Sequence, residues 1–124
     1  MNYFSLYVAL GVLLITVLAM NVSRVRIREK IGNGDGNNAS LKKAIRAHSN
    51  TLEHVVPFSL ILFSLTQLQT SASHLAIFSM GFILIRLLHS YSMLWSNFKL
   101  RQLSAGLTYL FEVAGCLMVL EKIV

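Results

Sequence analysis

The sequence predicts an all-α integral membrane protein, a four-helix bundle whose helices run alternately up and down through the bilayer. Hydrophobic residues make up 55% of the 124 residues and charged residues only 13%, and the mean hydropathy is +0.63. Soluble domains usually carry about a quarter charged residues. Lipid, rather than a large internal core, would therefore cover much of the apolar surface. We expect one four-span domain, residues 1–124, with helices at about 3–22, 39–68, 72–95 and 104–122.

The first helix is expected from Tyr3 to Val22, an apolar run of about 20 residues, or ~30 Å of helix, which is enough to span a bilayer. A cleavable signal peptide would begin with basic residues, and none precedes this run, so we interpret it as a retained span. The stretch 23–38 that follows is polar, and its end reads GNGDGNN. Glycines interleaved with Asn and Asp favour turns, so a loop is expected here.

The second helix is expected to begin with Asn38 or Ser40 as its N-cap. Its first half is polar, whereas Val55 to Leu68 is almost wholly apolar, so the helix should rise from the interface into lipid. Pro57 should kink this helix or leave a carbonyl free, which neighbouring helices accommodate in a membrane.

A third helix and a short basic turn, residues 97–103, lead to the fourth helix. The first and third loops hold most of the Lys and Arg residues, and the second loop has none. The positive-inside rule therefore places loops one and three in the cytoplasm and both termini outside. Cys116 is the sole cysteine, so no intrachain disulfide can form, and no metal site is predicted.

Polar side chains gather near the predicted cytoplasmic face. On a helix, Arg46, Asn50 and Glu53 fall within an arc of roughly 60°. Arg86 and His89 occupy the later half of the third helix, and Arg101 precedes the fourth from the same side. Charges at this depth are costly and normally face a protein interior or a wet cavity.

Two interpretations of this cluster remain open. Arg46 and Glu53 could pair with each other or with Arg86 and simply hold the helices together. Alternatively, because the cations outnumber the single glutamate, the surplus implies an anionic ligand with carboxylates of its own. Farther along, Glu112 is expected to pair with an arginine, and His54 is interpreted as interfacial.

The segment from Arg46 to Phe58, RAHSNTLEHVVPF, resembles the signature of the MAPEG family, the membrane-associated proteins of eicosanoid and glutathione metabolism. The element Arg86-Leu87-Leu88-His89 and the basic loop around Arg101 match in the same order. The Gly-Asp-Gly loop resembles the short bacterial members. The resemblance covers nearly the whole chain and is weakest in the first and fourth helices.

This resemblance implies a left-handed four-helix bundle that forms a homotrimer, with glutathione bound between neighbouring subunits near the cytosolic side. Arg101 would stabilise the thiolate of glutathione, since a nearby guanidinium favours the charged form of a thiol. The nucleophile would then be the sulfur of glutathione, so no protein nucleophile is needed. The residues implied to bind glutathione are Asn50 and Glu53, with Glu53 near its amino group, then Arg46, Arg86 and His89 around the site, and Arg26 or Arg28 from the adjacent subunit.

Two departures from the family pattern narrow the implied activity. Ser49 stands where the prostaglandin-synthase branch has a second arginine, and Met93 stands where those members carry a tyrosine. Eicosanoid synthesis is therefore not expected. We expect a glutathione transferase or a peroxidase-like protein of the bacterial inner membrane, acting on lipophilic electrophiles.

The alternatives are a non-catalytic or diverged membrane scaffold of the same fold and a small multidrug transporter. Transporters of that size depend on a buried glutamate in their first helix, and residues 3–22 carry no charge. No nucleic-acid partner is expected, because the topology of the chain explains its basic loops.

Overall fold

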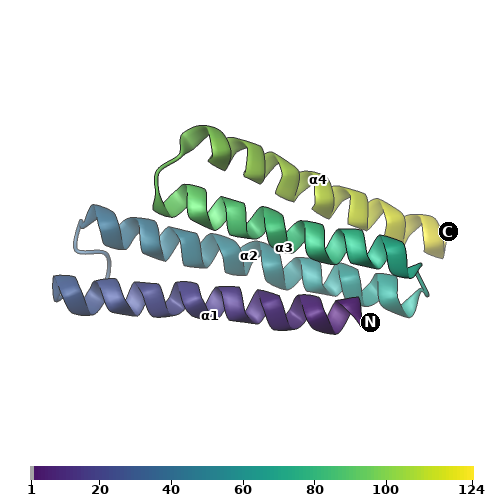
Figure 1. Cartoon of the computed structure of the whole chain (residues 1–124), viewed down its shortest axis with the longest axis horizontal. Coiled ribbons are helices and arrows are strands. Elements are labelled where there is room, and N and C mark those ends of the chain that lie inside the picture. The colour runs from purple at the N-terminus through teal and green to yellow at the C-terminus, as the bar shows by residue number, and fades with distance from the viewer. Residues whose placement is uncertain (1) are drawn as a thin grey trace.

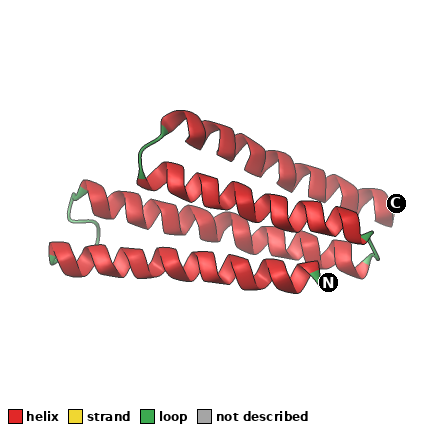
Figure 2. Ribbon diagram, in the orientation of Figure 1, coloured by secondary structure: helices red, strands yellow, loops and turns green. Residues whose placement is uncertain are grey.

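The computed structural model describes residues 2–124, which form four helices and no strand (Figure 2). The predicted all-α, up-and-down bundle is confirmed, and both termini lie at the same end of it (Figure 1). The helices are α1 (Tyr3–Glu29), α2 (Ala39–Gln67), α3 (Ala72–Leu94) and α4 (Phe98–Ile123).

Three of these helices, α1, α3 and α4, are long and apolar enough to cross a membrane. The second helix, α2, does not meet the same criterion of length and composition. Its 29 residues would be long enough, but its first half carries Lys42, Lys43, Arg46 and Glu53. The polar first half that the sequence predicts is therefore what separates α2 from its neighbours.

An Asn or Ser side chain caps the start of every helix by accepting a hydrogen bond from a backbone N–H of the first turn. For α2, the sequence leaves Asn38 and Ser40 open as the cap. The structure assigns this role to Asn38, whose Oδ1 accepts the Leu41 N–H at 2.9 Å. The other caps are Asn2, Ser71 and Asn97.

The expected end of the first helix at Val22 is wrong, since α1 continues to Glu29. Its extra two turns carry several arginines, which are good helix formers and which favour the negative end of the helix dipole. The helix ends at Lys30, which adopts a left-handed conformation (φ 56°). The glycine-rich turn is confirmed but is shorter than expected, with Gly34 and Gly36 at φ 63° and 56°.

The expected start of the fourth helix at Ser104 is also wrong, because α4 begins at Phe98. Asn97 caps it by accepting the Leu100 N–H at 3.1 Å, and no glycine or proline interrupts residues 98–103. Arg101 therefore lies in the first turns of a helix rather than in a loop.

Aromatic side chains form the centre of the bundle. Phe58 of α2 and Phe82 of α3 are fully buried and stack with ring centroids 3.7 Å apart. Tyr7 of α1 packs against both rings, and its hydroxyl donates a hydrogen bond of 2.9 Å to the Val55 carbonyl. This bond satisfies the buried phenol and ties α1 to α2.

The helices α2 and α3 lie between α1 and α4, which do not contact each other within residues 2–124. Only Ser104, Thr108 and Gly115 of α4 are buried. Most large apolar side chains of α1 and α4 are consequently exposed. In a membrane protein, lipid or another protein chain covers such surfaces.

Candidate functional site

A cavity of about 350 Å³ lies among α2, α3 and α4 and contains five of the residues that the sequence singles out. The spacing of Arg46, Asn50 and Glu53 brings them to one face of α2, as expected. His89 enters from α3 and Arg101 from the first turns of α4. The full lining is Arg46, Ser49, Asn50, Glu53, His89, Met93, Arg101, Ala105 and Tyr109.

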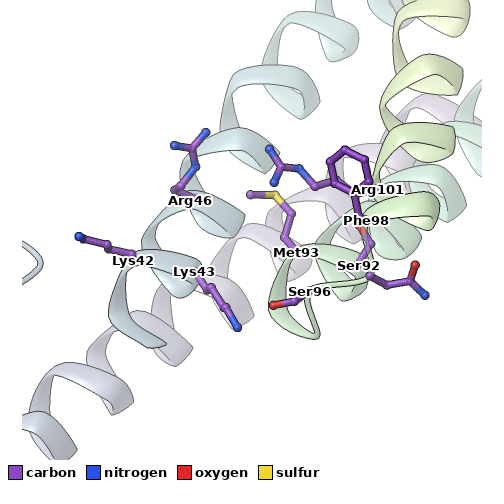
Figure 3. Close-up of a pocket in the computed structure, with 9 residues that line it drawn as sticks. Lys42, Lys43, Arg46, Ser92, Met93, Ser96, Phe98 and Arg101 are labelled. Atoms are coloured by element: carbon purple, nitrogen blue, oxygen red, sulfur yellow. The ribbon is translucent and has the colours of Figure 1, made fainter. Parts of the chain in front are cut away.

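A second cavity of about 270 Å³ adjoins the first and shares Arg46, Met93 and Arg101 with it. Its other cations are Lys42 and Lys43, and no carboxylate lines it. Figure 3 shows the lysines and Arg46 on α2, Arg101 on α4, and the Met93 side chain extending between the two arginines. We call the two cavities together the α2–α4 groove.

The charged groups of the groove are not paired with one another. Within residues 2–124, the ion pairs are Arg28–Glu29 and His54–Glu112. Neither Arg46 nor Arg86 forms an ion pair with Glu53, so the interpretation that these residues pair to hold the helices together does not describe this structure. The groove keeps a free carboxylate beside several free cations.

Two helix N-termini add to the positive potential at this end of the groove. The smaller cavity is lined by residues from the first two turns of α2 and the first turn of α4. Neither helix has an acidic residue in its first turn, although an acidic side chain at that position would stabilise the helix by interacting with its dipole. The first turns of α2 and α4 instead carry basic residues, which destabilise an isolated helix at its N-terminus. A bound anion would interact favourably with these cations and with the free backbone N–H groups.

Arg86 does not line the groove but lies beneath it, with 1% of its surface exposed. Its guanidinium donates to Asn50 Oδ1 at 2.7 Å and to Thr108 Oγ1 at 3.1 Å. A contact of 3.4 Å to His89 Nδ1 completes the set. Arg86 therefore connects α3 to α2 and α4, and it fixes the side chain of Asn50, which lines the groove.

Arg26 and Arg28 are outside the groove of their own chain. The Arg26 guanidinium donates to the Gly34 carbonyl at 2.7 Å, which braces the turn after α1. Arg28 pairs with Glu29 at 2.7 Å and also donates to Ser40 Oγ. Their suggested reach into a neighbouring subunit stays a prediction.

Comparison with known proteins identifies the family. The model of the MAPEG family matches residues 4–120, almost the whole chain. The chain belongs to the MAPEG family. It is similar to the inner membrane protein YecN of Escherichia coli K12, with 28% identity over 121 residues that cover 96% of this chain and 88% of YecN. YecN of E. coli O6:H1 (strain CFT073) matches to the same extent. No solved structure matches this MAPEG protein at a significant level.

One expected pairing in this MAPEG protein is wrong. The partner of Glu112 is His54, not an arginine, with Nδ1 and Oε1 2.8 Å apart. His54 is therefore not a free interfacial residue, since it joins α2 to α4 halfway along the bundle. Arg86, the buried arginine of α3, bonds instead to the neutral Asn50 and Thr108 side chains.

Sequence reasoning also missed part of the groove lining. Tyr109 enters it from α4 about two turns after Arg101, at a position roughly 80° around the helix from it. Lys42 and Lys43 also line the groove, where they face residues of the α3–α4 turn. This proximity depends on tertiary packing, which sequence patterns do not show.

Proposed function

We propose that this protein is a membrane-embedded, glutathione-dependent transferase or peroxidase-like enzyme that acts on lipophilic electrophiles. The observation that carries the proposal is the unpaired Glu53 carboxylate in one groove with the unpaired cations Arg46 and Arg101. The MAPEG family includes glutathione transferases, and the chain matches the family model over residues 4–120. Membership of the family suggests glutathione as the ligand, and the charged side chains of the groove are suited to bind it.

The charges of the groove match those of glutathione, which has one ammonium group, two carboxylates and a thiol. Glu53 would accept the ammonium group. The carboxylates would bind among Lys42, Lys43 and Arg46 through charge-assisted hydrogen bonds. None of these cations has a carboxylate partner within residues 2–124, and Lys42 donates only to the neutral Asn37 side chain. The free amide NH₂ of Asn50 would donate to a carbonyl or carboxylate oxygen of the tripeptide.

Arg101 would favour the thiolate of bound glutathione. Its guanidinium lines both cavities and carries no ion pair within residues 2–124, so its charge is available to a ligand. The thiolate sulfur would attack an electrophilic carbon and form a new carbon–sulfur bond as the leaving group departs with its electron pair. A lipophilic substrate would approach from the bilayer, past the exposed apolar side chains of α4.

Assembly and orientation are part of the proposal. A homotrimer would place Arg26 or Arg28 of one subunit near the groove of the next. Loops one and three lie at the same end of the bundle (Figure 1) and carry most of the basic residues, which favours a cytoplasmic position. Since YecN is an inner membrane protein, we place this protein in the inner membrane with its termini outside.

Turnover of a lipophilic electrophile or hydroperoxide by the purified protein, with reduced glutathione as co-substrate, tests the proposal. Arg101→Ala should lower turnover by roughly tenfold or more, because each unit of thiol pKa changes the thiolate fraction about tenfold. Glu53→Gln should raise the concentration of glutathione needed for half-maximal rate. The matched control is Lys99→Ala, which removes a charge from the same turn of α4 but lines neither cavity.

Equal rates for all four proteins would contradict the assignments of Arg101 and Glu53. Absence of any thiol-dependent turnover would favour the alternative, a diverged member of the fold without catalysis. The replacement of a family tyrosine by Met93, which lines both cavities, is the feature that favours this alternative.

A further inference from the structure

A separate basic cavity lies at the loop end of the bundle and is lined by α1, α2 and α3 rather than by α4. Its volume is about 450 Å³. We call it the α1–α3 pocket. Three cations, two neutral polar side chains and an indole line it, and no carboxylate does. Its residues are Asn21, Arg24, Val25, Arg28, Ala39, Ser40, Lys43, Leu94 and Trp95.

The cations of the α1–α3 pocket are only partly neutralised. Arg28 pairs with Glu29, but the guanidinium of Arg24 bonds to the neutral Asn21 Oδ1 at 3.0 Å. Lys43 forms no ion pair within residues 2–124. The pocket thus carries net positive charge and has no acidic group to hold the ammonium group of a zwitterionic ligand.

Two apolar ridges run from this pocket into the membrane-spanning part of the bundle. On α1, Met20, Val17 and Leu13 precede Arg24 by four, seven and eleven residues, and each is at least 60% exposed. This spacing keeps them on the face of Arg24. The ridge on α3 has the same spacing before Trp95 and is formed by the exposed side chains of Tyr91, Leu88 and Leu84.

The two ridges belong to helices that pack against each other, and both begin at residues of the one pocket. Trp95 also stacks on Tyr91 with ring centroids 4.7 Å apart, and both are residue types that are enriched at the membrane–water interface. A soluble anion would use only the polar wall of the pocket. A ligand with an anionic head and long apolar tails would use the pocket and both ridges.

We infer that the α1–α3 pocket binds the phosphate of an anionic phospholipid, whose acyl chains lie along the ridges of α1 and α3. Basic pockets between membrane helices bind such headgroups through phosphate oxygens. Arg24 and Lys43 hold the phosphate, and Ser40 and Asn21 supply hydrogen bonds. Lys43 lines both this pocket and the α2–α4 groove. The inference still does not require the proposed enzymatic function, because Arg24 and Trp95 line the pocket and not the groove.

Native mass spectrometry of the full-length protein in detergent tests the inference. The probes are phosphatidylglycerol, phosphatidylcholine with the same acyl chains, and glycerol 3-phosphate. We expect phosphatidylglycerol to be retained at least about tenfold more tightly than phosphatidylcholine. Lys43→Gln should weaken retention of phosphatidylglycerol roughly fivefold, because that is the usual contribution of one cation near an anionic headgroup. Arg24→Gln/Lys43→Gln removes two cations and should weaken retention by roughly fivefold for each of them.

The matched control is Lys42→Gln/Lys99→Gln, which removes two charges from the same end of the bundle but none from the pocket. Retention should remain that of the unchanged protein. An equal loss in this control would show nonspecific attraction and overturn the site. Equal retention of the two lipids would overturn the preference for an anionic head, and binding of glycerol 3-phosphate as tight as that of the lipid would overturn the lipid as the ligand. The single variant Lys43→Gln keeps the test decisive if the double variant fails to fold.

Discussion

At the scale of single residues, Arg86 is the charged side chain that the fold encloses most completely. Its partners on α2 and α4 are neutral, and its Nε has no hydrogen-bond partner in the described structure. A buried cation without a carboxylate partner costs solvation free energy. Its planar guanidinium offsets part of that cost, because its two NH₂ groups reach Thr108 on α4 and Asn50 on α2 from one rigid fork.

Arg86→Lys should therefore lower the stability of the protein by about 1–3 kcal/mol, because one of the two interhelical bonds is lost and a buried polar group is left unsatisfied. Thermal unfolding in detergent measures the change. Arg24→Lys, at an exposed position, is the control and should leave the unfolding temperature unchanged. Equal unfolding temperatures for Arg86→Lys and the original protein would show that Arg86 does not hold the helices together.

The candidate site illustrates which residues a sequence can place. Arg46, Asn50 and Glu53 were predicted to share a face because their positions on one helix follow from helical geometry alone. Their lack of mutual ion pairs was not predictable, since it depends on side-chain directions in the packed bundle. Thr108 as a partner of Arg86 was missed for the same reason, because 22 residues separate the two.

At the scale of helices, close packing depends on small residues where two backbones approach. Gly11 of α1 faces α2, and an added Cβ would lie 2.7 Å from Val55 Cγ1. Gly106 of α4 has no atom within 4 Å of the equivalent position. Membrane helices commonly use small residues in this way at their contacts.

Gly11→Ala and Gly106→Ala should consequently have opposite effects. The methyl group at Gly11 overpacks the α1–α2 contact and should cost about 1–3 kcal/mol. The same change at Gly106 should be neutral or should stabilise α4 by up to about 1 kcal/mol, because alanine is the better helix former. Unfolding of both variants in the same detergent compares them, and similar shifts would contradict the α1–α2 packing described here.

Helix ends were the least predictable feature at this scale. The basic stretches after Val22 and before Ser104 were interpreted as loops because charge marks the membrane boundary. Charge, however, does not end a helix. The first helix ends at Glu29 because Lys30 adopts a left-handed conformation. The fourth helix begins at Phe98 because the Asn97 side chain caps it.

At the scale of the whole molecule, charge and apolar surface are sharply separated. All the Lys and Arg residues except Arg86 and Lys122 lie at the end of the bundle that holds the first and third turns. The long exposed faces of α1 and α4 are apolar. The sequence predicted this bundle because hydropathy and turn signals determine it. It did not determine that α1 and α4 lie apart, which is a matter of packing.

The proposed orientation predicts the accessibility of cysteines in intact cells. In a Cys116→Ser background, Ser73→Cys, in the first turn of α3, should react with a membrane-impermeant maleimide, because the proposed orientation places that end of the bundle outside. Asn33→Cys, in the turn after α1, should react only after the cells are opened. The reverse pattern would invert the orientation and place the α2–α4 groove on the outer side.

The central claim is that the α2–α4 groove binds glutathione through its free carboxylate and free cations. Calorimetric titration of reduced glutathione into the detergent-purified protein tests it most directly, with Glu53→Gln as the variant and Lys99→Gln as the charge control. We expect saturable binding that Lys99→Gln preserves and Glu53→Gln weakens severely. Absence of binding at millimolar glutathione, or equal binding by Glu53→Gln, would contradict it.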